Sequence, residues 1–185
     1  LPLGRILGDA LGWRVTFGLI GIFAVGVGAW LYKILPLLPS KNSGSLKSLP
    51  ELARNGLLMV VFLLTAIIIS AHFSTYSYIE PFAKDISGFD RKFITIFLLI
   101  FGVAGVVASL LFSKFYKLIP NAFSAISIML ILCCLLVLNC IAKNEVLMLA
   151  LAFVWGLGIA GVNMSFQIKV LNLALNATDA AMAIF

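Results

Sequence analysis

The sequence predicts an all-α, polytopic membrane protein, and three observations support this prediction. First, 63% of the 185 residues are hydrophobic and the mean hydropathy is +1.16. Second, only 11% of the residues are charged, which excludes the soluble globular class. Third, the apolar residues form runs of about 20, the length at which a helix rising about 1.5 Å per residue crosses the hydrocarbon. These runs predict about five full transmembrane helices and two partial ones, one at each end.

The first part of the chain leads to one full span. Residues 1–11 are too short and too rich in glycine and charge to cross a membrane alone, so we expect them to be the tail of a helix that starts upstream. Gly12, Trp13 and Arg14 predict a tight turn with an aromatic side chain at the interface. Residues 15–35 then predict a full span, in which four glycines would let neighbouring helices approach closely.

A polar linker and the remaining spans follow. Residues 36–56 are rich in Pro, Ser, Gly and Lys and predict a linker, with a short amphipathic helix over residues 48–54. The later apolar runs predict four more spans and one partial helix, at residues 57–81, 92–112, 121–142, 146–168 and 178–185.

The span over residues 57–81 has a second half that lipid would not accept. On a helix, His72, Tyr76 and Glu80 form one stripe because they are four residues apart. A second polar stripe, roughly opposite, consists of Ser70, Ser74 and Ser77. Because polar groups at membrane depth face a bundle interior or a watery cavity, we expect other helices to enclose this segment, with one stripe near a solute. Pro81 is expected to end the helix, since the residue before a proline disfavours the helical conformation.

The candidate site residues divide into two groups. His72 and Tyr76 are expected to contact the solute, and His72 or Glu80 to couple transport to protons, because an imidazole titrates near neutral pH. The alternative is that His72 only bonds a neighbouring helix and Glu80 lies in interfacial water near Lys84.

The second group lies in the last full span. Trp155, Asn163 and Gln167 fall on roughly one face and are expected to bind solute, since aromatic faces and side-chain amides recognise sugars. Hydrogen bonding between helices is the alternative for these residues.

Several other patterns predict no chemistry. Gly156, Gly158 and Gly161 match GxGxxG, but without a preceding strand they indicate close helix packing and not a dinucleotide site. Two glycosylation patterns lie within or beside spans and are discarded. The three cysteines, in one apolar run, are expected to be free thiols with no metal partner. We therefore expect no metal and no cofactor.

The net charge of +6 does not indicate nucleic-acid binding. The 13 Lys and Arg residues lie in the short connections between apolar runs and not on one basic face, so anionic lipid headgroups are the expected counterions. Seven of the 13 fall on the linker side and six on the other, which barely favours one orientation.

Four strings suggest a family: PLGRILGDALGWRVTF, LPLLPSKNSGSLKSLP, TAIIISAHFSTYSYIEPF and FQIKVLNLALNATDAAMAIF. They resemble the middle of a bacterial sugar efflux transporter of the major facilitator superfamily, in its drug/proton antiporter branch, and the resemblance covers essentially the whole chain. It implies a bundle of two six-helix halves. Residues 1–35 would then end the N-terminal half, residues 36–56 would be the cytoplasmic central linker, and residues 57–185 would hold helices seven to ten and the start of eleven.

The resemblance also implies a function. It predicts a secondary active transporter of the bacterial inner membrane that exports sugars or sugar-like small molecules by alternating access and proton antiport. Its partners would be the sugar, protons, the lipid bilayer and the N-terminal helices missing from this chain, without which the chain is expected to be inactive. The nearest alternative is a drug or amino-acid exporter on the same fold.

Two alternatives come from other classes. An intramembrane enzyme would use His72 and Glu80 as acid and base or as metal ligands, but the chain has one histidine and no other acid in mid-span. A structural membrane subunit would not need the polar half of residues 57–81. Metal-dependent activity would favour the enzyme, and gradient-driven solute flux would favour the carrier.

Overall fold

A computed structural model describes residues 8, 11–35, 49–175 and 177–185, and every regular element in these ranges is a helix. The expected helix tail over residues 1–11 lies almost wholly outside the described residues. The chain divides into two compact units, residues 1–41 and 42–185. The helices are α2 (Trp13–Ile34), α3 (Leu49–Arg54), α4 (Gly56–Pro81), the π-helical η2 (Phe82–Ile86), α5 (Arg91–Phe115), α6 (Pro120–Val137), α7 (Glu145–Leu173) and α8 (Thr178–Ile184).

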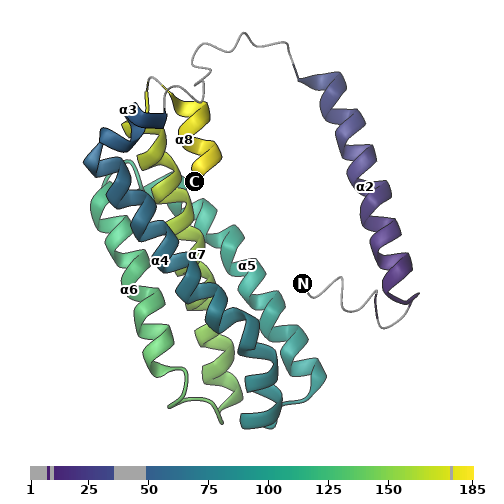
Figure 1. Ribbon diagram of the computed structural model, residues 1–185. Helices are drawn as coiled ribbons and strands as arrows, with labels where there is room; N and C mark the ends of the chain where they lie inside the picture. The colour runs from purple at the N-terminus through teal and green to yellow at the C-terminus, as the bar shows by residue number, and fades with distance from the viewer. Residues whose placement is uncertain (1–7, 9–10, 36–48, 176) are drawn as a thin grey trace. The chain divides into compact units, whose positions relative to one another are not determined.

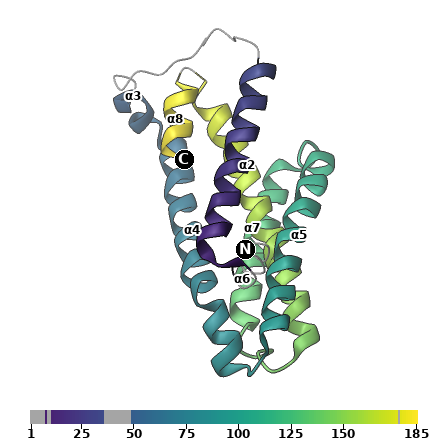
Figure 2. The same ribbon diagram turned by 90° about the vertical axis from the view of Figure 1, so that its right-hand side faces the viewer.

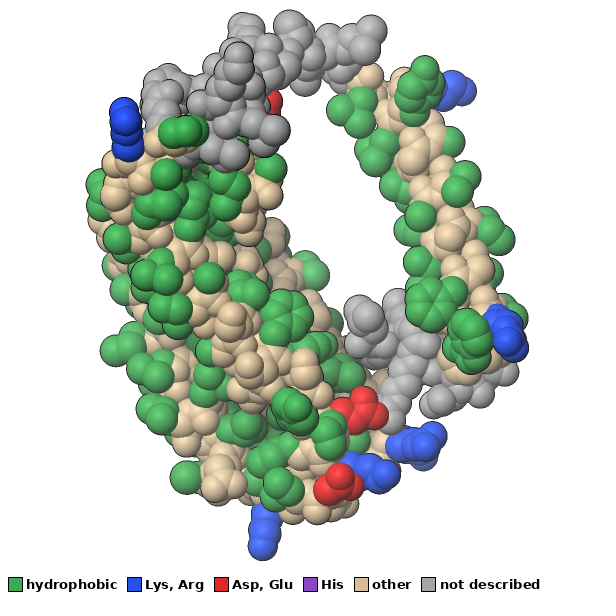
Figure 3. All heavy atoms as spheres, viewed as in Figure 1, with side chains coloured by type: hydrophobic (Ala, Val, Ile, Leu, Met, Phe, Trp, Pro, Cys, Tyr) green, Lys and Arg blue, Asp and Glu red, His purple; other side chains and the backbone are tan. Residues whose placement is uncertain are grey.

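Five helices of the described ranges are long and apolar enough to cross a membrane: α2, α4 with η2, α5, α6 and α7. They confirm the five predicted spans, and α3 and α8 confirm the two short helices. In Figure 3 the charged side chains on the visible face lie towards the helix ends, so a hydrophobic band separates them. The chain is therefore a multi-pass, all-α membrane protein.

The first unit contains α2, which follows a break at Gly12. Gly12 has φ +82°, a left-handed conformation that glycine adopts without strain. The predicted turn is confined to this residue, because Trp13 and Arg14 already belong to the first turn of α2. An added Cβ at Gly18, Gly21, Gly26 or Gly28 would meet no described atom within 4 Å, so the expected close packing is not made by the part of the chain that the structure describes.

In the second unit, α7 is the central helix (Figure 1). It packs along α5 and α6 and also contacts α4, and α8 lies beside its C-terminal end in both ribbon views (Figures 1 and 2). Half of the most apolar 18-residue stretch of α7 is buried, against 11% for α4 and 22% for α5 and α6. The core of this unit is therefore built around α7.

The glycines of α7 explain this close packing. A Cβ at Gly156 would lie 2.6 Å from the carbonyl oxygen of Phe101 in α5, and one at Gly161 would lie 2.5 Å from Oγ of Ser127 in α6. A Cβ at Gly158 would also touch α6, 2.9 Å from a side-chain carbon. The GxGxxG pattern is thus a packing face, as predicted.

The α-helix α4 ends at Pro81, as predicted, but a π-helical turn that was not predicted follows it directly. Pro81 has helical angles, φ −61° and ψ −36°, and the chain continues through η2. Proline removes one backbone donor and crowds the carbonyl four residues earlier, and a wider π turn follows it. In that turn the amide of Ser87 donates to the carbonyl of Phe82 at 3.1 Å. The chain then reverses at Gly88, which has φ +74°.

One side chain joins the start of α4 to the end of α7. The Oδ1 atom of Asn55 accepts a hydrogen bond from the amide of Leu58 at 3.2 Å and so caps α4. Its Nδ2 atom donates to the carbonyl of Leu173, the last residue of α7, at 3.1 Å. Asn55 therefore satisfies free backbone groups at two helix ends at once.

Candidate functional site

Three helices of the second unit bring four aromatic rings together, and we call this group the four-ring cluster. His72 and Tyr76 come from α4, Phe101 from α5 and Trp155 from α7. Gly156 contributes to this arrangement, since its lack of a side chain lets α7 approach the carbonyl of Phe101 and so brings the ring of Trp155 to α4 and α5. The cluster confirms that His72 and Tyr76 share a stripe of α4, as their spacing predicts.

The four rings are packed against one another with no space between them. All six centroid-to-centroid distances lie between 5.3 and 6.3 Å, so the centroids form a nearly regular tetrahedron. The centre of such a tetrahedron lies about 3.5 Å from each centroid, which is one van der Waals contact. The rings of His72 and Phe101 are almost parallel, at 10°, while Trp155 stands edge-on to the other three at 74–80°. In this arrangement a solute cannot lie among the rings.

The cluster contains two buried polar atoms. Trp155 is fully buried and His72 is 6% exposed, whereas Tyr76 and Phe101 are half-buried. Neither Nδ1 of His72 nor Nε1 of Trp155 has a hydrogen-bond partner among the described residues. Leaving a buried donor or acceptor without a partner costs about 1–3 kcal/mol, and most buried polar groups have one. Two of the three such atoms in the described part of the chain therefore lie on adjacent rings of the cluster, and the third is Oγ of Ser87.

The other predicted site residues lie elsewhere. Asn163 and Gln167 are exposed on α7, so the expectation that they share a face with the buried Trp155 is wrong. At about 100° per residue, positions 8 and 12 residues after Trp155 are turned by about 80° and 120° from it. That rotation carries both amides from the face that packs on α4 and α5 to the exposed surface of the unit.

Described helices enclose the polar second half of α4 only at His72 and, in part, at Tyr76, whereas the expectation was that they enclose all of it. Glu80 is exposed, and so are Ser70, Ser74 and Ser77. The structure thus brings together three predicted residues, namely His72, Tyr76 and Trp155, and leaves the remaining ones on the surface of the unit.

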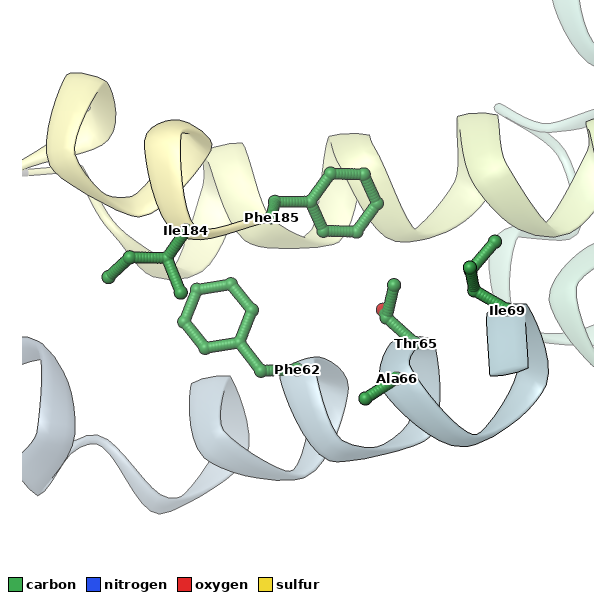
Figure 4. Close-up of a pocket in the computed structure, with 6 residues that line it drawn as sticks. All are labelled: Phe62, Thr65, Ala66, Ile69, Ile184 and Phe185. Carbon is green, nitrogen blue, oxygen red and sulfur yellow. The ribbon is translucent and has the colours of Figure 1, made fainter. Parts of the chain in front are cut away.

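A small cavity of about 160 Å³ lies between α4 and the C-terminal end of the chain (Figure 4). Its walls are Phe62, Thr65, Ala66 and Ile69 from α4, with Ile184 and Phe185 opposite. Its one hydroxyl, of Thr65, donates to the carbonyl of Val61 at 2.8 Å. Ile69 lies one turn before His72, so the cavity follows the same face of α4 as the four-ring cluster.

The described residues offer no group of three His, Cys, Asp or Glu side chains that could hold a metal ion. The cysteines are free thiols, as expected: Cys134 is buried, whereas Cys133 and Cys140 are exposed.

Phe101 is the member of the cluster that sequence reasoning missed. It is one of 15 phenylalanines and lies in an uninterrupted apolar run, where no polar neighbour distinguishes it. Its role depends on which face of α5 meets α7, and hydropathy carries no information about that choice.

The sequence comparisons cover the whole chain. The sequence model of the Major Facilitator Superfamily matches residues 1–185. A Pasteurella multocida (strain Pm70) protein named "Probable sugar efflux transporter" is 48% identical over 185 residues, which are 100% of this chain and 46% of that protein. A protein of the same name from Helicobacter acinonychis (strain Sheeba) is 49% identical, again over the whole chain and 47% of its own length. The chain spans about half the length of the curated relatives it matches.

Proposed function

The chain belongs to the Major Facilitator Superfamily, and from this premise we propose that the protein exports sugars or sugar-like small molecules across the bacterial inner membrane. The observation that carries the proposal is the 48–49% identity, over all 185 residues, to bacterial proteins named probable sugar efflux transporters. The four-ring cluster adds to it, because aromatic rings with a few polar atoms are the usual means of binding a sugar.

We propose that the solute binds at the four-ring cluster. His72, Tyr76 and Trp155 would contact it there, whereas the amides of Asn163 and Gln167, which are exposed on another face of α7, would contact a solute only outside the cluster. Because the rings fill their own centre, a solute would touch the cluster at the half-buried edge of Tyr76 or would separate the rings. A carrier must open its site to each side of the membrane in turn. Rings that separate when the solute binds and close when it leaves would allow this.

The proposal has two further parts, namely the coupling of solute transport to protons and the division of the chain between two halves of a carrier. His72 and Glu80 are the candidates to bind and release the proton that is transported in exchange for the solute. His72 is a candidate because it is the only histidine of the sequence and lies in the four-ring cluster. Residues 1–35 and 57–185 would belong to two halves that rock against each other, joined by residues 36–56 as a cytoplasmic linker. A complete carrier would also need helices beyond these 185 residues.

Transport in inverted membrane vesicles tests the proposal. We expect a labelled galactoside or pentose to accumulate when a proton gradient is imposed and to accumulate less without it. His72→Gln and Glu80→Gln should weaken this dependence on the gradient, while Ser109→Ala, an exposed position of α5, serves as the matched control. A folded wild-type protein that moves a cationic dye or an amino acid but no sugar would contradict the sugar assignment and favour another exporter on the same fold.

A further inference from the structure

The imidazole of His72 lies against aromatic rings on several sides. Besides Tyr76, Phe101 and Trp155, the ring of Phe73 lies edge-on to it, with the centroids 5.1 Å apart and the planes at 65°. His72 is only 6% exposed, and its Nδ1 atom is buried without a hydrogen-bond partner in the described part of the chain. The ring most nearly parallel to the imidazole is that of Phe101, at 10° and 5.9 Å between centroids. The closed cluster therefore gives His72 aromatic carbon in place of water.

The helices that carry these rings place no charged side chain at the depth of His72. On α4 the nearest charged residue is Glu80, which is exposed and lies about 12 Å further along the helix axis. On α5 and α7 the nearest are Lys92 and Glu145, about 14 and 15 Å along the axis from the ring-bearing residue. The other titratable group among the rings is the phenol of Tyr76, which is neutral near pH 7. Within the described helices, His72 thus has no opposite charge beside it.

The two forms of the imidazole fit this environment unequally. A neutral ring leaves Nδ1 as an uncharged donor or acceptor without a partner. A protonated ring carries a hydrogen on both nitrogens, so Nδ1 would be a charged donor without an acceptor, and the indole of Trp155 cannot accept because it only donates. Stacking on aromatic faces recovers only a small part of the cost of burying an unpaired charge. The closed cluster therefore suits the neutral ring and excludes the charged one.

We propose that protonation of His72 separates the four rings, and that Phe101 is the positioning residue that holds the imidazole in the closed arrangement. A protonated His72 reaches water only when its ring leaves Phe101 and Trp155, so closure and protonation exclude each other. The α4 helix suits this movement, because only 11% of its most apolar stretch is buried. The inference rests on the proposed function and gives the proton a task in it, since the proton opens the rings that a solute must otherwise separate.

Quenching of Trp155 fluorescence by acrylamide tests the inference in the full-length protein, at about pH 8 and about pH 5 and without any sugar. The signal of Trp155 is the difference between each protein and its Trp155→Phe counterpart. The ratio of protonated to neutral imidazole changes tenfold for each pH unit, so Trp155 should be quenched about tenfold more strongly at the lower pH. His72→Phe keeps a ring that cannot be protonated, and its Trp155 should stay protected at both pH values.

The variant Phe101→Leu tests the positioning role. Loss of the ring parallel to His72 should leave Trp155 accessible at both pH values, so that the difference in quenching between them disappears. Phe97→Leu is the matched control, because Phe97 is a buried phenylalanine one turn earlier in α5 and has no ring contact with His72 among the described residues. It should keep the wild-type difference in quenching even where it lowers stability.

The possible failures are distinguishable. Equal protection of Trp155 at both pH values in folded wild type would overturn the inference and leave the proposed export of sugars standing. A difference in quenching that persists in His72→Phe would mean that another group opens the rings, and one that persists in Phe101→Leu would remove the positioning role. A wild-type protein that exposes Trp155 at the lower pH but accumulates no sugar in vesicles would overturn the proposed function and not the ring opening.

Discussion

The contrast between α7 and α4 shows what organises this protein. Over its most apolar 18-residue stretch α7 is less apolar than α4, yet half of that stretch of α7 is buried against 11% for α4. Hydrophobicity cannot drive helices together in lipid, so close contact depends on small residues. Gly156, Gly158 and Gly161 supply them in α7, where added Cβ atoms would collide with α5 and α6. By contrast, α4 has polar side chains on an exposed surface and contributes two rings to the proposed site.

The largest expected effect comes from the point where the two helices meet. Trp155→Ala should reduce the free energy of unfolding by about 3–5 kcal/mol, because it removes a fully buried ring from the cluster. Trp30→Ala, at a position 64% exposed on α2, should cost far less. Unfolding of the chain in detergent micelles measures both, and equal losses would contradict the central place given to Trp155.

The next prediction concerns the packing face of α7. Gly156→Ala should reduce the free energy of unfolding by about 1–3 kcal/mol, since the new Cβ would lie 2.6 Å from a backbone oxygen of α5. Gly102→Ala is the matched control in α5, where an added Cβ meets no described atom within 4 Å. That change should be neutral or should stabilise the helix by up to about 1 kcal/mol. A Gly156→Ala variant as stable as Gly102→Ala would show that close approach does not hold α7 in place.

A smaller effect is expected where a single side chain joins the two helices. Asn55→Ser keeps an oxygen to cap α4 but loses the bond to the carbonyl of Leu173, so it should cost about 1 kcal/mol. Asn144→Ser is the matched control, because Asn144 caps α7 through the amide of Leu147 in the same way. Hydrogen exchange at the last turn of α7 should rise for Asn55→Ser and not for Asn144→Ser. An equal rise in both would mean that the cross-helix bond contributes nothing.

The smallest effect on stability should come from the exposed stripe of α4. Ser74→Ala removes a hydroxyl that is exposed in the described structure, so the free energy of unfolding should change by less than about 0.5 kcal/mol. Ser124→Ala is the comparison, because it removes a buried hydroxyl that donates to the carbonyl of Pro120 at 2.9 Å. Thermal unfolding of both variants measures the difference between an exposed and a buried serine. A larger loss at Ser74 would show that this stripe packs against protein.

Much of the fold follows from the sequence, because spans are set by the length of apolar runs and a helix face by residue spacing. The five spans, the glycine packing face of α7 and the pairing of His72 with Tyr76 were all predictable in this way. The π-helical turn after Pro81 was not, since local preference at a proline disfavours a continued helix and a π turn has no clear sequence pattern.

The rest of the candidate site depends on how each helix is rotated about its axis. Asn163 appeared to share a face with Trp155, but a rotation of about 80° separates a buried side chain from an exposed one. Phe101 enters the cluster only because α5 presents that side to α7. Neither rotation can be read from one sequence, because contacts between helices determine it.

The most direct test of the account measures stability and sugar affinity together in full-length His72→Phe. The account predicts that the variant unfolds less readily than wild type, by about 1 kcal/mol, because it removes a buried nitrogen that has no partner among the described residues. It also predicts that the same variant binds galactoside about tenfold more weakly. A variant that loses stability and keeps its sugar affinity would contradict the account and make His72 a packing residue.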